Sequence, residues 1–255
     1  MLTSPSRLVS RASNKILSKV GKYLNRDLLT GIALFPSSTL EKIGSQYGGW
    51  IVPTDLLTPD SICYCVGVGE DITFDLGLID RFHCRVFAYD PTPRAAQHVK
   101  LYATQYPAYR FDSVGVWDTN ASVKFYAPIN PDNVSHSALN LQKTDRYFEA
   151  QCKTVKTLMR ENGHHRLDLL KLDVEGAEYQ VVDSLIADEL DIHILCIEYD
   201  EAYNPLDYNY KQRIQASVSR LLHYGYTMTA VDARGNYTFI KKPATRLMRF
   251  GSGRE

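Results

Sequence analysis

The chain has 255 residues, 44% hydrophobic and 23% charged, and its 29 basic and 29 acidic residues cancel to a net charge of zero. This is the composition of an ordinary globular protein, and the zero charge argues against a general attraction to nucleic acid, so we expect no nucleic-acid partner. No run approaches the roughly 18 apolar residues that a membrane-spanning helix needs. The five cysteines are an odd number, and three lie in apolar segments, so we expect reduced thiols and a cytoplasmic protein.

The first 60 residues differ from the rest. Six basic side chains precede the first acid, Asp27, at intervals of about four residues, and apolar residues at helical spacing predict a basic amphipathic helix. Its role stays open between an accessory helix packed on the core or contacting a partner, a weak membrane-surface contact and a transit peptide. Residues 31–60 contain many glycines and prolines and are interpreted as a lead-in or lid, in which Tyr47, Trp50 and Ile51 cover a ligand or pack over the sheet.

A strand, a glycine turn, a helix and a second strand follow between Ser61 and Asp90. Two parallel strands joined by a helix place a crevice at their carboxyl ends. Gly67 and Gly69 allow a ligand to approach the main chain. Asp90 follows Gly67 by 23 residues, close to the roughly 20 expected of an acid that binds a ribose. The segment therefore predicts a site for an adenosine-containing cofactor.

A third strand is expected over residues 109–116, where Asp112 and Ser113 would flank the adenine. Residues 122–126 are interpreted as an extended arm. Residues 127–143 form a long polar loop centred on His136, and such loops often carry function.

The most apolar strand, 167–172, runs directly into Asp173 and Glu175. Open α/β sheets place their chemistry at such strand ends, so these two acids and His136 are the candidates for a base that deprotonates a hydroxyl. Glu198, at the end of the next strand, is a weaker candidate. A metal is compatible with Asp173 and its neighbours, but no ligand spacing requires one, and we assign no metal ligands.

The order of these elements indicates the fold class. Strands alternate with helices up to two closely joined strands, 226–231 and 237–240. The alternation predicts one mostly parallel α/β sheet with helices on both faces, and the last two strands predict an antiparallel hairpin. We expect one domain over residues 61–245, followed by a basic tail at 246–255.

The glycine turn also distinguishes among adenosine cofactors. The pattern G-x-G-x-x-G fails because Ile72 occupies the third glycine position. Glu70 and Asp71 stand at the expected start of the helix, where they would repel a pyrophosphate but suit a positive charge. S-adenosylmethionine carries an ammonium and a sulfonium and no phosphate, so it is the predicted cofactor. A nicotinamide-dependent oxidoreductase and a non-catalytic protein that uses the same fold to bind a partner are the alternatives.

Three stretches resemble the FkbM family of S-adenosylmethionine-dependent methyltransferases. They are VGVGED at 66–71, FAYDP at 87–91 and LLKLDVEGAE at 169–178, the last being the most specific. The resemblance covers about residues 61–198 and implies a seven-stranded, Rossmann-like class I methyltransferase sheet that methylates a hydroxyl on a sugar or other small metabolite. The family commonly has an acid two residues before the first glycine, where this chain has Cys65. Glu70 or Asp71 could replace that acid.

Overall fold

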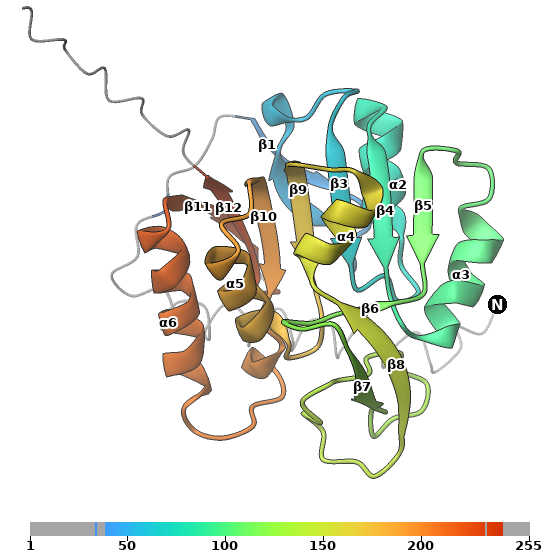
Figure 1. Ribbon diagram of the computed structural model, residues 1–255, viewed down its shortest axis with the longest axis vertical. Helices are drawn as coiled ribbons and strands as arrows, with labels where there is room; N and C mark the ends of the chain where they lie inside the picture. The colour runs from blue at the N-terminus through green and yellow to red at the C-terminus, as the bar shows by residue number, and fades with distance from the viewer. Residues whose placement is uncertain (1–33, 35–38, 233, 242–255) are drawn as a thin grey trace, which may run out of the picture.

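The computed structural model in Figure 1 describes residue 34, residues 39–232 and residues 234–241. The predicted basic helix of residues 1–30 and the basic tail at 246–255 lie outside these residues. Within the described ranges no helix combines the length and the apolar character needed to cross a membrane.

A seven-stranded sheet forms the centre of the molecule, in the order β11-β12-β10-β9-β3-β4-β5 (Figure 1). The five strands from β10 to β5 pair in parallel, and β12 pairs antiparallel with β10 and β11. This confirms the predicted mostly parallel α/β sheet with a C-terminal antiparallel hairpin. The strands are β3 (Ile62–Val66), β4 (Arg85–Tyr89), β5 (Tyr109–Asp112), β9 (Leu167–Leu172), β10 (Ile192–Glu198), β11 (Tyr226–Val231) and β12 (Asn236–Lys241).

Side chains alternate along these strands and fill two hydrophobic layers. Tyr64 and Leu170 belong to the layer under α4, α5 and α6, whereas Cys63 and Leu169 belong to the layer under α2 and α3. Because both faces are covered, the central strands are continuous apolar runs, which is why the sequence predicted them well. The helices are α2 (Thr73–Phe82), α3 (Pro93–Tyr102), α4 (Val155–Asn162), α5 (Glu178–Ala187) and α6 (Tyr210–His223).

A three-stranded sheet is inserted between β5 and α4. It consists of β6 (Gly115–Val116), β8 (Tyr147–Lys153) and β7 (Ala121–Tyr126), in that order. The expected single strand over 109–116 is therefore wrong, because the chain leaves the main sheet after β5 and pairs next with β8.

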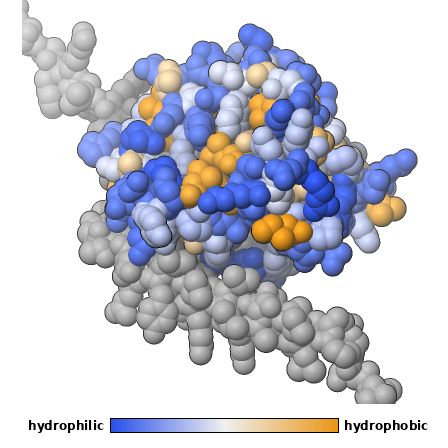
Figure 2. All heavy atoms as spheres, turned by 90° about the horizontal axis from the view of Figure 1, so that it is seen from below, coloured by the Kyte–Doolittle hydropathy of each residue, from blue (hydrophilic) through white to orange (hydrophobic). Residues whose placement is uncertain are grey.

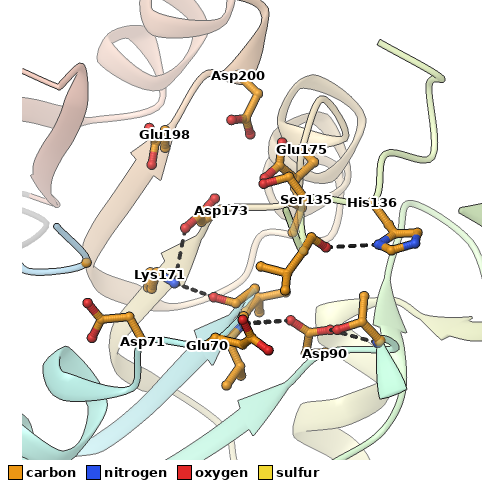
Figure 3. A pocket seen from close by; sticks show the side chains of 18 of the residues that line it. Glu70, Asp71, Asp90, Ser135, His136, Lys171, Asp173, Glu175, Glu198 and Asp200 are labelled. Atoms are coloured by element: carbon orange, nitrogen blue, oxygen red, sulfur yellow. Dashed lines mark hydrogen bonds and ion pairs between the residues drawn. The ribbon is translucent and has the colours of Figure 1, made fainter. Parts of the chain in front are cut away.

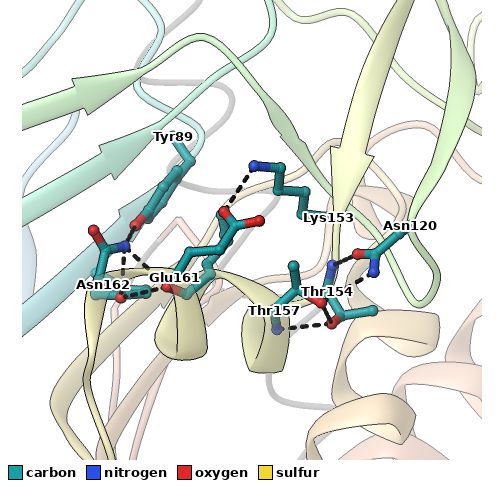
Figure 4. A network of polar contacts seen from close by, with 9 residues as sticks. Tyr89, Asn120, Lys153, Thr154, Thr157, Glu161 and Asn162 are labelled. Carbon is teal, nitrogen blue, oxygen red and sulfur yellow. Dashed lines mark hydrogen bonds and ion pairs between the residues drawn. The ribbon is translucent and has the colours of Figure 1, made fainter.

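Polar contacts at both ends of α4 hold this insertion against the main sheet (Figure 4). At the N-terminus of the helix, Asn120 accepts a hydrogen bond from Thr154 N at 2.9 Å and donates one to Thr157 Oγ1 at 3.0 Å. At the other end, Asn162 Nδ2 donates to the hydroxyl of Tyr89 on β4 at 3.0 Å. The insertion is thus tied to α4, and α4 is tied in turn to the end of β4.

The described part of the lead-in is a hairpin of β1 (Leu40–Ile43) and β2 (Trp50–Pro53), followed by the short helix η1 (Thr54–Leu56). Trp50 is 1% exposed and lies against Phe74 of α2, with 6.4 Å between ring centroids. Thr238 on β12 donates a hydrogen bond to the carbonyl of Ile51 at 2.6 Å. The hairpin is therefore packed into the fold, as the lead-in interpretation allowed, and is not a detached lid.

Figure 2 views the molecule from the carboxyl ends of the parallel strands. The coloured surface is mostly hydrophilic, with separate small groups of hydrophobic atoms. Such scattered apolar groups are ordinary for a protein surface.

Candidate active site

A cavity of about 920 Å³ lies at the carboxyl ends of β3, β4, β9 and β10. This is the switch point of the sheet, since the chain proceeds from β3 toward β5 on one side and from β9 toward β10 on the other. The volume is near the upper end of the roughly 300–1,000 Å³ typical of ligand pockets. The predicted site residues that line it are Gly67, Gly69, Glu70, Asp71, Asp90, His136, Asp173, Glu175 and the weaker candidate Glu198.

Asp112 and Ser113 do not line the cavity, contrary to the expectation that they flank an adenine. The chain turns after β5, where Val114 N donates to the Asp112 carbonyl at 2.9 Å, and Gly115 and Val116 line the cavity instead. Tyr47 and Trp50 of the hairpin also line it.

The first glycine of the turn is required by a close approach to β9. Gly67 has φ +80°, and a Cβ atom there would lie 1.7 Å from the carbonyl oxygen of Asp173. No larger residue fits without moving one of the two segments. Gly69 has φ +57°, a conformation that side chains disfavour.

Asp90 holds this glycine turn in place by accepting hydrogen bonds from its backbone. One carboxylate oxygen, Oδ2, accepts from the backbone N–H groups of Val68 and Gly69, each at 2.9 Å. The other, Oδ1, accepts from Thr92 N at 2.8 Å and from Thr92 Oγ1 at 2.6 Å. The side chain is only 5% exposed. The structure therefore gives Asp90 a bracing role, and its predicted contact with a ribose stays a prediction.

Glu70 does not stand at the start of α2, which begins at Thr73. Instead its two carboxylate oxygens accept hydrogen bonds from one edge of the Arg94 guanidinium, from Nε at 2.9 Å and from Nη2 at 2.7 Å. Arg94 also donates to backbone carbonyls at Pro131, Asp132 and Asn133. The pair thereby ties the loop between β7 and β8 to the glycine turn.

Asp71 also has a local role. Its Oδ1 accepts from Thr73 N at 3.0 Å, and its Oδ2 accepts from Ser45 Oγ at 2.6 Å. Partial burial opposes ionisation, but the hydrogen bonds from Ser45 and Thr73 outweigh it and lower the pKa of Asp71. The carboxylate joins the hairpin to the start of α2.

Lys171 is a site residue that the sequence analysis missed. It lies inside β9, is 5% exposed, and donates to the carbonyl of Gly67. Its Nζ is 3.3 Å from Asp173 Oδ2. Burial opposes the charge, but Asp173 and Asp75 outweigh it and raise the pKa of Lys171, which is therefore a buried cation. A lysine inside a buried strand, whose other residues are leucines and Asp168, was the available signal.

Cys65, the residue that departs from the family pattern, does not line the cavity. It is fully buried and lies opposite Lys171 in the pairing of β3 with β9. Burial raises the pKa of its thiol well above the usual range, so the group is neutral. Lys171 finds its negative partner in Asp173 instead.

Acidic side chains gather on the cavity wall at the ends of β9 and β10 (Figure 3). This acidic wall consists of Asp173, Glu175, Glu198 and Asp200. One carboxylate oxygen from each of Asp173, Glu175 and Asp200 lies within 4.8 Å of the others. Removal from water and the neighbouring Asp173 raise the pKa of Glu175 to about 8. The pKa values of Glu198 and Asp200 are raised as well, mainly because both groups are buried and also because other acids lie near them. Asp200, the first residue of the short helix η2 (Asp200–Ala202), carried no sequence prediction.

The loop between β7 and β8 completes the cavity with His136, as its length and polarity suggested. His136 Nδ1 is 2.9 Å from the carbonyl of Val134, and its ring meets Phe148 edge-on with 5.2 Å between centroids. Ser137 Oγ donates to the carbonyl of Glu175 at 2.5 Å. Glu175 has φ +54°, a left-handed conformation that this contact helps to hold.

The chain is similar to known proteins in sequence. Its residues 57–227 match the family model of the methyltransferase FkbM domain. A probable methyltransferase-like protein 24 from Rattus norvegicus is 25% identical over 195 residues, covering 73% of this chain and 46% of that protein. The Homo sapiens protein of the same name is 27% identical over 128 residues, covering 50% of this chain and 28% of its own length. The chain thus matches less than half the length of either relative.

Solved structures with a similar arrangement include two fibrillarins. The pre-rRNA processing protein of Methanococcus jannaschii aligns with a TM-score of 0.45 and 12% identity, over 75% of this chain and 70% of that one. The Aeropyrum pernix fibrillarin, solved with natively bound S-adenosyl-L-methionine, aligns with a TM-score of 0.40 and 9% identity, over 84% and 85% of the two chains.

Proposed function

The chain belongs to the family of FkbM methyltransferase domains, and we propose that it transfers a methyl group from S-adenosylmethionine to a hydroxyl oxygen of a sugar or another small metabolite. In this reaction the acceptor oxygen forms a bond to the methyl carbon while the sulfur–methyl bond breaks. S-adenosylhomocysteine leaves, and the hydroxyl proton passes to a base. The protein supplies mainly placement, because the cofactor itself is the electrophile.

The glycine turn carries the argument for the cofactor. A pyrophosphate is usually bound by free backbone N–H groups at such a turn. Here the N–H groups of Val68 and Gly69 are both occupied by Asp90. The cavity wall beyond the turn is acidic, which opposes a phosphate and suits an ammonium or sulfonium group. These features support S-adenosylmethionine over a nicotinamide dinucleotide.

The acceptor would lie against the acidic wall, beside the end of β9. Asp173, Glu175 and His136 all line this part of the cavity and remain the candidates for the base. Several polar side chains at one place can each hydrogen-bond to a different hydroxyl, so this wall suits an acceptor with several hydroxyl groups. All five cysteines are buried and unpaired, which supports a reducing compartment such as the cytoplasm for this activity.

Calorimetric titration of the full chain tests the cofactor. We expect S-adenosylhomocysteine to bind saturably at one site, and NADH and ADP-ribose to show no saturable binding at the same concentrations. Saturable binding of NADH without binding of S-adenosylhomocysteine would establish the oxidoreductase alternative. Failure of all three would favour the non-catalytic alternative.

A second measurement tests the methylated atom. The chain is incubated with methyl-labelled S-adenosylmethionine and a panel of sugars, polyols and amines, and the products are examined by NMR. Methyl ethers are expected, and methylamines as the sole products would refute the assignment to oxygen.

A further inference from the structure

Three carboxylates that are distant in sequence meet at one point of the acidic wall. Asp173 leaves the end of β9, Glu175 lies in the following turn, and Asp200 follows the end of β10. One oxygen of each lies within 4.8 Å of the others. A cation bound at roughly 2.0–2.6 Å from each oxygen spans ligand atoms up to about 4–5 Å apart. The spacing therefore suits a single ion.

Within the described part of the chain, few cationic groups act on the carboxylates at this point. Lys171 and Arg234 act on the neighbouring Glu198, whereas Asp200 lies beside a further buried acid, Glu178. Lys171 Nζ lies 3.3 Å from Asp173 Oδ2. Asp200, however, is only 7% exposed, and its Oδ2 has no hydrogen-bond partner among the residues that the structure describes. Its carboxylate points into the space between Glu198 and Glu175 (Figure 3). A buried carboxylate oxygen without a donor is costly, and a bound cation would remove that cost.

We infer that Asp173, Glu175 and Asp200 form a binding site for one divalent cation of the oxygen-preferring class that includes Mg²⁺ and Mn²⁺. Carboxylates from separate segments are the ligands that these ions prefer. The turn that carries Glu175 is held by Ser137, which fixes its backbone beside Asp173. The sequence did not predict the site because Asp200 joins the other two only through the pairing of β9 with β10.

The consequence for the reaction rests on the proposed function, whereas ion binding itself does not. A divalent cation at this wall would bind acceptor hydroxyls, orient them and make a bound hydroxyl more acidic. Asp173 and Glu175 would then serve as ligands, which leaves His136 as the candidate base.

The test measures binding of Mn²⁺ to the full chain, without cofactor or acceptor, by the loss of the free-ion electron paramagnetic resonance signal. One saturable site is expected. Asp200→Asn should weaken binding about tenfold or more, since affinity in such sites depends on the number of ligand charges. Glu175→Gln should do the same and serves as the second variant if Asp200→Asn does not fold. Glu70→Gln is the matched control, because it removes a cavity carboxylate outside the cluster, and its binding should stay within about twofold of wild type.

Two outcomes overturn the inference. One is the absence of saturable binding at millimolar Mn²⁺, and the other is equal binding by wild type and both cluster variants. Titration of the same samples with S-adenosylhomocysteine separates this inference from the proposed function. Binding of S-adenosylhomocysteine without Mn²⁺ binding refutes only the ion site. Mn²⁺ binding without S-adenosylhomocysteine binding refutes only the proposed cofactor.

Discussion

Replacing Asp90 with asparagine should destabilise the whole domain through the glycine turn. The amide puts an NH₂ group where one carboxylate oxygen now accepts two hydrogen bonds, so a donor meets a donor. The Thr92 hydroxyl can rotate to accept, whereas the Thr92 N–H cannot. Losing one charge-assisted bond of about 1.5–3 kcal/mol and weakening the others predicts a total loss of about 2–4 kcal/mol.

Urea unfolding followed by tryptophan fluorescence measures this loss, since Trp50 is buried beside the cavity. The midpoint should fall while the slope stays unchanged. Thr92→Val is the control, because it keeps the charge of Asp90. It removes one donor to Asp90 and the long N-cap bond from Ala95 N to Thr92 Oγ1, and should cost about 1–2 kcal/mol. The bracing role is refuted if Asp90→Asn lies within about 0.5 kcal/mol of wild type or is less destabilised than Thr92→Val.

Ligand binding to the same variant separates bracing from a ribose contact. If Asp90 also binds the ribose, Asp90→Asn should weaken S-adenosylhomocysteine more than it weakens the 2′,3′-dideoxy analogue. If Asp90 only braces the turn, both ligands should lose affinity by the same factor. Unchanged affinity for both ligands would exclude either contribution to binding.

The close approach at Gly67 and the tie made by Arg94 give two more predictions. Gly67→Ala should cost about 3 kcal/mol or more, because its Cβ would collide with the Asp173 carbonyl, whereas Gly225→Ala, with φ +99° and nothing within 4 Å, should cost only about 1–2 kcal/mol in urea unfolding. Equal losses would refute the steric argument. Arg94→Met should change global stability by less than about 1 kcal/mol, because its pair with Glu70 is partly exposed to solvent, yet thermolysin should cleave the loop between β7 and β8 faster than in wild type. An unchanged cleavage rate would contradict the tie.

The central strands of the main sheet were predictable because they are apolar on both faces and are bounded by glycine and proline, whereas the edge strand β5 is only partly buried and its end was misplaced. Strand β8 was not, because its side chains alternate between exposed and partly buried and carry a weak apolar signal. The turn at Gly67 and the acid at Asp90 were found from their spacing. That spacing could not show that Asp90 hydrogen-bonds to the turn itself, which depends on the twist and separation of β3 and β4.

The sequence predicted only some of the residues of the acidic wall. Asp173 and Glu175 were found because they directly follow a buried strand. Asp200 acquires its role across a strand pair, so nothing local distinguishes it. Lys171 gave one local signal, a lysine within a buried strand, but its partners Gly67 and Asp173 depend on the pairing of β3 with β9. The position of α2 was misjudged for a different reason: Asp71 bonds to Ser45, a residue far back in the chain, and the helix begins only after this contact. Local signals thus predict elements, whereas contacts between distant segments determine the site.

The β1–β2 hairpin has a practical consequence for where a fragment of this protein can begin. The family match starts at residue 57, yet Trp50 and Val52 are buried before it, and the backbone at Gly44 fits directly against Phe74. A fragment cut at the family boundary would uncover the aromatic surface of α2 and one wall of the cavity. The unit that folds, and that should be expressed, crystallised or transplanted, therefore includes the hairpin from β1 onward.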